Sequence, residues 1–421
     1  MQEKEKLEIE FGEGCRTDLL HINKLPFIDY PDCEEIIKEY LGEAIKGLCK
    51  EPIGALEFPY VVPGAEYQDL WDWDGFFVSC SLPDEYAHYG KGAAQNFLSV
   101  VASNGKPTKK FTVDGYRENY SVACPIQAQY AYVMAARTGD FDWIKPYWEN
   151  LKKIRVWFDA NTRNYRGYYF YPHFMSNCLD NNPQVYGRRN NTSGGIDLVC
   201  WHYREIVAMY KLALKFEPQV AEEYKRQAEE VKKMINEQYW DKMDGCFYAI
   251  DCGEDFFQKT SQDISWNTYL KFRSCTCHYP LWAGAATPEH AKRIRDLIMS
   301  EDEFLSPAGV RSHSKADPVY NNIAMEDPSN WQGPVWGITS FMAALGLARY
   351  GYKEDALEIC RRMNTAFAND IKENGCFHEH YNGETGQPMI RPGFISWNAL
   401  AYRVAEDIRN GVDCTTYDML D

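Results

Sequence analysis

The chain has 421 residues, of which 45% are hydrophobic and 25% are charged, so it is long enough to bury a large core. Its 61 acidic and 45 basic residues give a formal net charge of -16 at pH 7. This acidic surplus argues against nucleic acid or an anionic membrane as the partner. Fourteen scattered cysteines without a CxxC pair, and an N-terminus without an apolar signal region, lead us to expect a cytoplasmic protein with reduced thiols and no membrane association.

Apolar segments of two kinds alternate along the chain, and their period indicates helices. Segments of the first kind are apolar nearly all round and must be covered on several sides. They lie at 125–136, 196–214, 335–348 and 395–405. A short turn and an amphipathic helix with one wet face follow the first three, as at 144–158, 221–235 and 356–363.

A buried helix, a turn and a wet helix, repeated along a chain, describe two concentric layers. Either an α/α toroid or an α-solenoid has this pattern. In both, the inner helices run parallel, so the segments that precede them emerge at one end of the molecule, where sites are usually built. We expect residues 1–45 to form an N-terminal extension and residues 46–421 to form one domain.

The long segments before the inner helices share one chemical character, an aromatic side chain beside a carboxylate or an amide. Aromatic residues make up 15% of the chain, more than core packing normally requires. Taken singly, each motif could be a core plug, a helix cap or a turn. Together they favour a carbohydrate site, because sugar rings stack on aromatic rings and their hydroxyls bind polar groups. The motifs lie at 71–77, 114–120, 179–183, 330–336 and 378–382.

Two carboxylates in these motifs could hydrolyse a glycosidic bond, one protonated and one ionised. Asp180 follows Leu179 in an apolar context, which predicts partial burial and a raised pKa. Glu379 lies between His378 and His380, which we expect to keep it ionised. The two histidines could instead bind a metal, but no third ligand is evident, so we expect neither a metal nor a cofactor.

The motifs resemble those of the family 63 glycoside hydrolases of the compact bacterial type, and more distantly those of the family 37 trehalases. The resemblance implies an (α/α)6 toroid and an inverting mechanism. The stretch 73–77 resembles the Trp-Asp-x-x-Phe segment that lines the subsite of the non-reducing sugar, and 114–120 resembles the trehalase segment Asn-Gly-x-Arg-x-Tyr-Tyr. The second similarity implies that Arg117 reaches a sugar hydroxyl.

Three later motifs follow in the order of the family. The stretch 178–183 resembles Gly-(Met/Leu)-Asp-(Asn/Asp)-Ser-Pro, which implies that Asp180 is the general acid. The downstream tract 195–198 matches the family and gives Asp197 a structural role. The stretch 331–336 resembles the Tyr-Trp-Arg-Gly-Pro-(Val/Ile)-Trp box. The stretch 377–386 resembles Phe-x-Glu-x-Tyr-Asn-x-x-Thr-Gly, in which Glu379 aligns with the general base.

The chain departs from the family pattern at several positions. Cys178 stands where the family has Gly, Asn182 where it has Ser, and Gln332 where it has Arg, and Gln127 is out of register with the expected Gln-Pro-Pro. An Arg-to-Gln change replaces a bidentate cation by a neutral amide. A carboxylate-bearing aglycone still fits, because Arg188, Arg189 and Arg391 lie in the same loops.

We therefore expect an inverting exo-acting α-glycosidase that releases a terminal α-linked glucose from a small carbohydrate substrate. The first alternative is the hydrolysis of mannosyl- or glucosylglycerate. A sugar epimerase of the N-acylglucosamine epimerase type and a non-catalytic helical scaffold stay open as other classes. We expect the carboxyl groups of Asp180 and Glu379 to lie roughly 6.5–9.5 Å apart. The predicted substrate-binding residues are Trp73, Asp74, Phe77, Arg117, Tyr120, Gln127, Trp331, Gln332, Gly333, Trp336, His378 and Tyr381.

Overall fold

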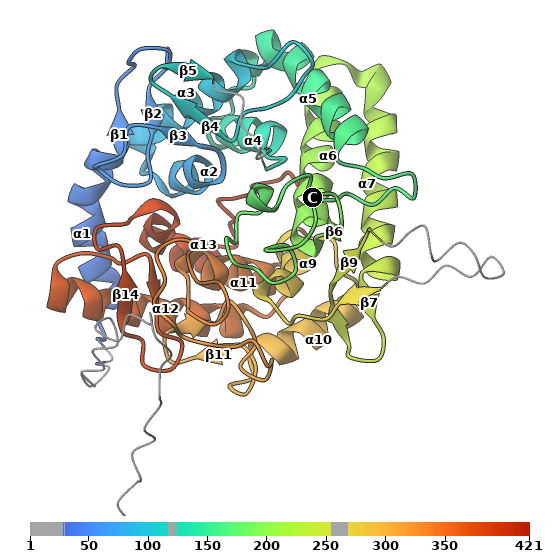
Figure 1. The fold of residues 1–421 in the computed structure, drawn as a ribbon. Coiled ribbons are helices and arrows are strands. Elements are labelled where there is room, and N and C mark those ends of the chain that lie inside the picture. The colour runs from blue at the N-terminus through green and yellow to red at the C-terminus, as the bar shows by residue number, and fades with distance from the viewer. Residues whose placement is uncertain (1–27, 29, 117–121, 123, 254–267) are drawn as a thin grey trace, which may run out of the picture.

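The computed structural model describes residues 28, 30–116, 122, 124–253 and 268–421. Figure 1 shows the helices as a closed ring, and the colour runs around it from α1 to α13. The ring closes where α1 (Cys33–Leu48) packs against α12 (Lys353–Asn374) and α2 (Asp72–Ser81) packs against the 3-10 helix η6 (Ser396–Tyr402). The predicted (α/α)6 toroid is confirmed.

The inner layer consists of segments that are buried on nearly all sides. Every residue of α2 and of α11 up to Leu347 is buried, which explains why these sequences carry apolar and small side chains without a wet face. The inner elements are α2, α4 (Gln127–Thr138), α6 (Ile196–Phe216), α9 (Tyr279–Trp282), α11 (Gly337–Arg349) and η6.

The outer layer consists of amphipathic helices that each bury one stripe. In α7, for example, Ala221, Ala228, Val231 and Ile235 are buried at helical spacing while the acidic and basic positions face water. The outer elements are α1, α3 (Ala87–Ser99), α5 (Trp148–Asn161), α7 (Pro218–Gln238), α10 (Pro288–Ile298) and α12, with α13 (Val404–Asn410) following η6.

The predicted helices agree with the structure within a few residues, with two differences. The buried segment 395–405 forms the 3-10 helix η6 followed by α13, and η6 begins at Ser396, whose φ is 33°. The predicted domain boundary after residue 45 falls inside α1, which packs on α12 and η6 as part of the ring. Within the described residues, the helices are all too short or too polar to span a bilayer.

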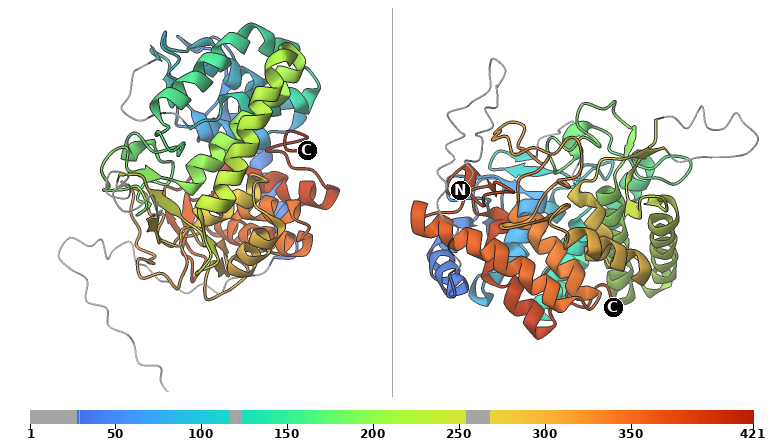
Figure 2. Two further views of the ribbon diagram at one scale, coloured as in Figure 1. Left: turned by 90° about the vertical axis from the view of Figure 1, so that its right-hand side faces the viewer. Right: turned by 90° about the horizontal axis from the view of Figure 1, so that it is seen from below.

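Short antiparallel strands brace the long loops. Two sheets have three strands, in the orders β3 (Leu70–Trp71), β4 (Lys110–Thr112), β5 (Gly115–Tyr116) and β6 (Ser193–Gly194), β9 (Ala249–Asp251), β10 (Tyr269–Leu270). The other strands form pairs: β1 (Cys49–Lys50) with β2 (Tyr60–Val61), β7 (Trp240–Asp241) with β8 (Cys246–Phe247), β11 (Leu305–Ser306) with β12 (Gly309–Val310), and β13 (His380–Tyr381) with β14 (Pro388–Ile390). Figure 2 shows these loops on one side of the ring and the C-terminal end of the chain on the other.

The C-terminal tail is fixed to the inner layer on the side away from the loops. Arg204 of α6 is fully buried and donates hydrogen bonds to the carbonyl of Thr415 at 2.6 Å and to Oγ1 of Thr416 at 2.8 Å. Its guanidinium also lies 3.7 Å from the ring of Trp282 in α9. This end of the toroid is therefore filled, and the loop end is left to carry the site.

Candidate active site

A cavity of about 200 Å³ lies at the loop end, where the segments before the inner helices meet. Both predicted catalytic carboxylates line it, although they lie far apart in the sequence. The lining residues are Pro63, Tyr67, Trp71, Trp73, Asp74, Lys109, Cys178, Asp180, Ser329, Trp331, Trp336, Glu379, Arg391, Phe394 and Trp397.

Indole rings form much of the cavity wall. Trp331 and Trp336 stack in parallel with ring centroids 3.8 Å apart, and Trp73 lies 5.0 Å from Trp397 and 6.1 Å from Trp331. All four rings are buried, so their positions are set by one another and by the inner helices. Such a wall offers flat apolar faces to the C–H side of a sugar ring.

The start of α2 places a second carboxylate pair beside these rings. Asp72 is fully buried and accepts the backbone N–H groups of Trp73 and Cys124, each at 2.8 Å. Asp74 lines the cavity and accepts the Ser396 hydroxyl at 2.6 Å. Burial raises the pKa of Asp72 to about 6 and that of Asp74 to about 7.

Asp180 is held by a tightly bonded loop. The Asn177 side chain accepts the N–H of Leu179 at 3.1 Å and donates to its carbonyl at 2.9 Å, and the N–H of Ser329 approaches Oδ2 of Asp180 at 3.3 Å. Burial raises the pKa of Asp180, although the charge of Lys109 and the Ser329 hydrogen bond act in the opposite direction. The raised pKa agrees with the prediction made from its apolar neighbours.

Glu379 lies immediately before β13, and its backbone N–H donates to the carbonyl of Ile390 at 3.0 Å. Only 5% of its side chain is exposed, and the nearest cation is Arg391, whose Nη1 lies 3.5 Å from Oε1. Burial raises the pKa of Glu379 to about 8; Arg391 opposes this shift, and the negative charge of Asp180 adds to it. Oε2 has no hydrogen-bond partner among the described residues.

The two histidines beside Glu379 do not keep it ionised, so that expectation was wrong. Neighbouring side chains of an extended segment point to opposite sides. His378 therefore turns to the α12 carboxylate of Asp370, 2.9 Å from its Nδ1. His380 is buried 4.5 Å from the Trp336 ring, and burial lowers its pKa to about 3, so it is neutral.

Six of the predicted substrate-binding residues are not among those that line the cavity. Phe77 packs on Trp73, and Tyr381 donates to Asp370 at 2.7 Å. Their burial assigns them a supporting position. The others in this group are Gln127, Gln332, Gly333 and His378. Arg117 and Tyr120 lie outside the described residues.

Gln332 and Gly333 show what the supporting residues do. The Gln332 amide donates to the carbonyl of Asn181 at 2.9 Å and accepts from the Asn321 amide at 3.1 Å, so it fixes the loop that carries Asp180. A Cβ at Gly333 would lie 1.9 Å from the carbonyl oxygen of Asn321, so only glycine allows this approach.

The cavity contains a lysine that the sequence motifs did not single out. Lys109 donates to the carbonyl of Met175 at 3.0 Å, and its own carbonyl accepts the N–H of Asp72. Burial by itself would lower the pKa of Lys109, but neighbouring acidic groups, Asp72 and Asp180 among them, outweigh this and raise it. A charged ammonium group therefore faces the cavity. Its signal in the sequence is weak, since only the pairing of β3 with β4 places Lys109 next to 71–74.

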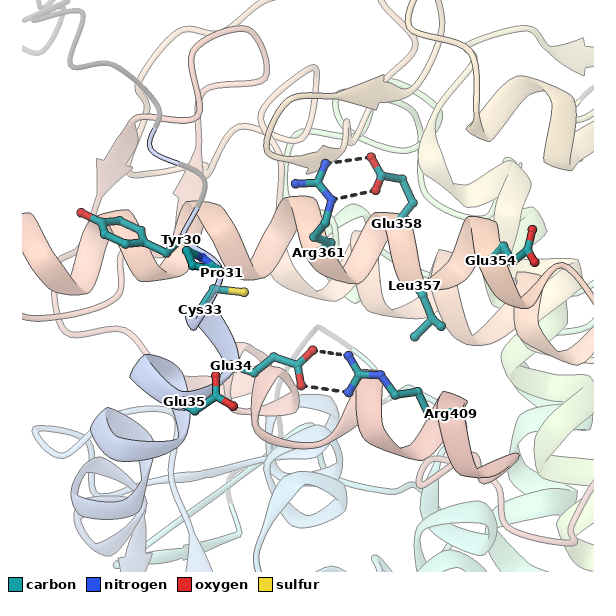
Figure 3. Close-up of a pocket in the computed structure, with 10 residues that line it drawn as sticks. All are labelled: Tyr30, Pro31, Cys33, Glu34, Glu35, Glu354, Leu357, Glu358, Arg361 and Arg409. Atoms are coloured by element: carbon teal, nitrogen blue, oxygen red, sulfur yellow. Dashed lines mark hydrogen bonds and ion pairs between the residues drawn. The ribbon is translucent and has the colours of Figure 1, made fainter.

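A second cavity, of about 820 Å³, lies between outer helices α1, α12 and α13 (Figure 3). Four of its charged side chains form two ion pairs, Glu34 with Arg409 at 2.9 Å and Glu358 with Arg361 at 2.8 Å. None of the described candidate residues lines it. The smaller, indole-walled cavity is therefore the candidate active site.

Comparisons with known proteins indicate which family the chain resembles. A family model described as the mannosylglycerate hydrolase MGH1-like glycoside hydrolase domain matches residues 202–397, which include Trp331, Trp336 and Glu379. The crystal structure of the family 63 mannosylglycerate hydrolase from Thermus thermophilus with glucose superposes with a TM-score of 0.63 at 18% identity, over 89% of this chain and 99% of that one, and so shares the fold. These findings support an assignment of the chain to the family 63 glycoside hydrolases.

Two curated relatives extend the comparison. The cytosolic neutral trehalase of Kluyveromyces lactis is 22% identical over 411 residues, which cover 78% of this chain and 51% of the trehalase. The mannosylglycerate hydrolase MGH1 of Selaginella moellendorffii is 33% identical over 121 residues, which cover 28% of this chain and 22% of that protein. The matches thus span at most about half the length of these relatives.

The raised pKa of Glu379 predicts a pH-dependent effect of Glu379→Gln on stability. The folded-state pKa of about 8 lies above the ordinary value of 4.5. The contribution of Glu379 to the stability of the parent protein is therefore greatest below pH 4.5, where the carboxyl is neutral in both states, and this contribution is lost as the pH rises towards 8. Urea unfolding should show the variant gaining stability relative to the parent protein between pH 5 and 8, and no further gain above that range.

Glu384→Gln is the matched control, since Glu384 lies in the same loop. Its ion pair with Lys315 at 2.7 Å outweighs partial burial and lowers its pKa, so it is ionised in both states above pH 5. Its difference from the parent protein should stay constant across the same range. A constant difference for Glu379→Gln as well would mean that the Glu379 carboxyl is ionised in the folded protein.

Proposed function

We propose that this protein is an inverting exo-acting α-glycosidase that releases one terminal sugar from a small glycoside. The observation that carries the proposal is the placement of Asp180 and Glu379 in one cavity walled by indoles. Its volume of about 200 Å³ is below the roughly 300 Å³ typical of pockets for drug-sized ligands. This size favours one sugar ring over an oligosaccharide.

Inversion needs one protonated and one ionised carboxyl group on opposite sides of the bond. Asp180 and Glu379 both have raised pKa values, and each negative charge disfavours the other, so the pair retains a proton near neutral pH. A pair that shares one proton has the required stoichiometry. A separation of roughly 6.5–9.5 Å would leave room for the attacking water.

We assign Asp180 as the general acid and Glu379 as the general base, following the family motifs. In this assignment Asp180 protonates the glycosidic oxygen as the bond to the anomeric carbon breaks. Glu379 takes a proton from the water that attacks the opposite face. Arg391 supports the ionised form of Glu379, since its guanidinium lies 3.5 Å from the carboxylate. In the reverse assignment Glu379, whose pKa is raised by burial, would be the general acid. The response of variants of the two residues to the leaving group distinguishes the two assignments.

The two roles respond differently to the leaving group. Fluoride leaves without a proton, so Asp180→Asn should still hydrolyse α-glucosyl or α-mannosyl fluoride while losing roughly 10²–10⁴-fold on alkyl glycosides. Glu379→Gln should lose turnover on both. Initial rates of the two variants on both substrates provide the measurement. Retained fluoride hydrolysis by Glu379→Gln, with loss in Asp180→Asn, would reverse the assignment.

Two cations of the cavity indicate the chemistry of the aglycone, the part of the substrate that leaves. α-Linked glucose is the expected sugar, but Lys109 and Arg391 both line the cavity that contains Asp180. Two cations beside the acid favour an aglycone with a carboxylate, because charge-assisted hydrogen bonds are the stronger ones. This favours mannosyl- or glucosylglycerate over neutral glucosides as the substrate. Arg188, a further cation considered from the sequence, is instead paired with Asp251.

Lys109→Met should therefore discriminate between substrates by aglycone charge. Loss of one hydrogen bond to a charged group costs about 1.5–3 kcal/mol, so kcat/KM for the glycerates should fall by roughly 10–100-fold more than for methyl glycosides. Lys110→Met is the matched control, because Lys110 pairs with Asp69 at 2.5 Å and does not line the cavity. Equal losses on charged and neutral substrates would contradict the anionic aglycone.

A further inference from the structure

The wall of the cavity contains a thiol that the proposed reaction does not use. Cys178 lines the cavity two residues before Asp180, at the position where the family motif has glycine. It is half-buried, whereas most of the thirteen described cysteines, all without a disulfide, are buried. A small oxidant that enters the cavity therefore reaches Cys178.

A second thiol lies beside it. The N–H of Val122 donates to Oγ of Ser176 at 2.9 Å, so the segments around 122–124 and 176–178 run next to each other. Two residues further along both segments, the Cys178 side chain interacts with the Cys124 thiol. The Cys124 backbone is anchored to Asp72, which keeps this pairing in place.

The surroundings of the two thiols indicate which of them reacts first. Access to the oxidant decides which of two neighbouring thiols is oxidised first. Cys178 lines the cavity and is half-buried. Cys124 is buried away from solvent, and burial raises its pKa well above the usual value, as does the neighbouring Cys178. Cys178 is thus placed to react first and Cys124 to react second.

We propose that Cys178 and Cys124 form an oxidisable pair in which hydroperoxide converts Cys178 to a sulfenic acid and Cys124 closes the disulfide. In the first step the Cys178 sulfur attacks one peroxide oxygen, the O–O bond breaks, and the departing hydroxide takes up the thiol proton to leave as water. In the second step the Cys124 sulfur attacks the Cys178 sulfur, the S–O bond breaks, and hydroxide leaves with the Cys124 proton as water. Two thiols are oxidised by two electrons, and hydrogen peroxide is reduced to two waters.

The disulfide acts on the catalytic loop through its covalent geometry. A sulfur–sulfur bond of about 2.05 Å draws the two side chains closer than two non-bonded thiols can lie. The movement falls on the loop of Asp180, because Cys178 is two residues from it. The oxidised protein therefore has a displaced general acid, and a thiol reductant restores it. This loss of activity rests on the proposed function, whereas formation of the disulfide does not.

The experiment treats the full chain with hydrogen peroxide, blocks the remaining thiols with N-ethylmaleimide and maps disulfides by mass spectrometry. Each sample is also assayed for glycosidase activity before and after dithiothreitol. We expect a linked 124–178 peptide pair and a reversible loss of activity of roughly tenfold or more. Cys376, which is half-buried and outside the cavity, provides the matched control variant Cys376→Ser, which should behave as the parent protein.

Two variants separate the steps. Cys124→Ala should lose the cross-link and retain a sulfenic acid on Cys178, which a dimedone probe labels. Cys178→Gly, the residue of the family motif, should abolish both the label and the cross-link, with activity compared with its own untreated sample. Absence of a 124–178 link in the parent protein, or oxidation of Cys376 at the same rate as Cys178, would overturn the proposal. A link without any glycosidase activity would sustain it and count against the proposed function alone.

Discussion

The site depends on the electrostatic cost of holding carboxyl groups together in one small, largely apolar cavity. Glu379 is almost fully buried and its second oxygen has no hydrogen-bond partner among the described residues, while Asp180 lies in the same cavity. Desolvation and mutual repulsion disfavour two negative charges there, so the pair holds on to a proton. Lys109 and Arg391 reduce this cost, and Arg391 does so through an ion pair with Glu379 at 3.5 Å.

The toroid makes such an arrangement possible by fixing the loops that carry the two groups. The Asp180 loop is held by Asn177, Ser329 and the Gln332 amide, and the strand next to Glu379 is held by β14. Behind them the indoles pack on α2, α11 and η6, which are buried on nearly all sides. Rigid supports of this kind keep the two carboxyl groups in place against their mutual repulsion.

Much of the fold followed from the sequence because burial sets the hydrophobic period directly. Segments such as 196–214 are apolar all round because they lie inside a ring, and α7 is amphipathic because it lies outside. The cavity positions of Asp180, Glu379 and the indoles at 73, 331 and 336 followed from motifs in which an aromatic adjoins a carboxylate.

What could not be predicted depends on contacts between distant segments. Lys109 faces the cavity only because β4 pairs with β3, and nothing in its local sequence shows this. The histidines beside Glu379 were expected to keep it ionised, but strand alternation turns them away and burial keeps His380 neutral. Gln332 adjoins the cavity residue Trp331 in sequence, yet its hydrogen bonds hold the Asp180 loop.

The most direct test of the central claim is the configuration of the sugar at the moment of release. Proton NMR recorded in the first minutes of hydrolysis of α-glucosyl- or α-mannosylglycerate reports the anomer before mutarotation mixes the two forms. Two carboxyl groups on opposite sides of the bond, with a water beside Glu379, predict that the β-anomer appears first. Appearance of the α-anomer first would show a double displacement and contradict the account.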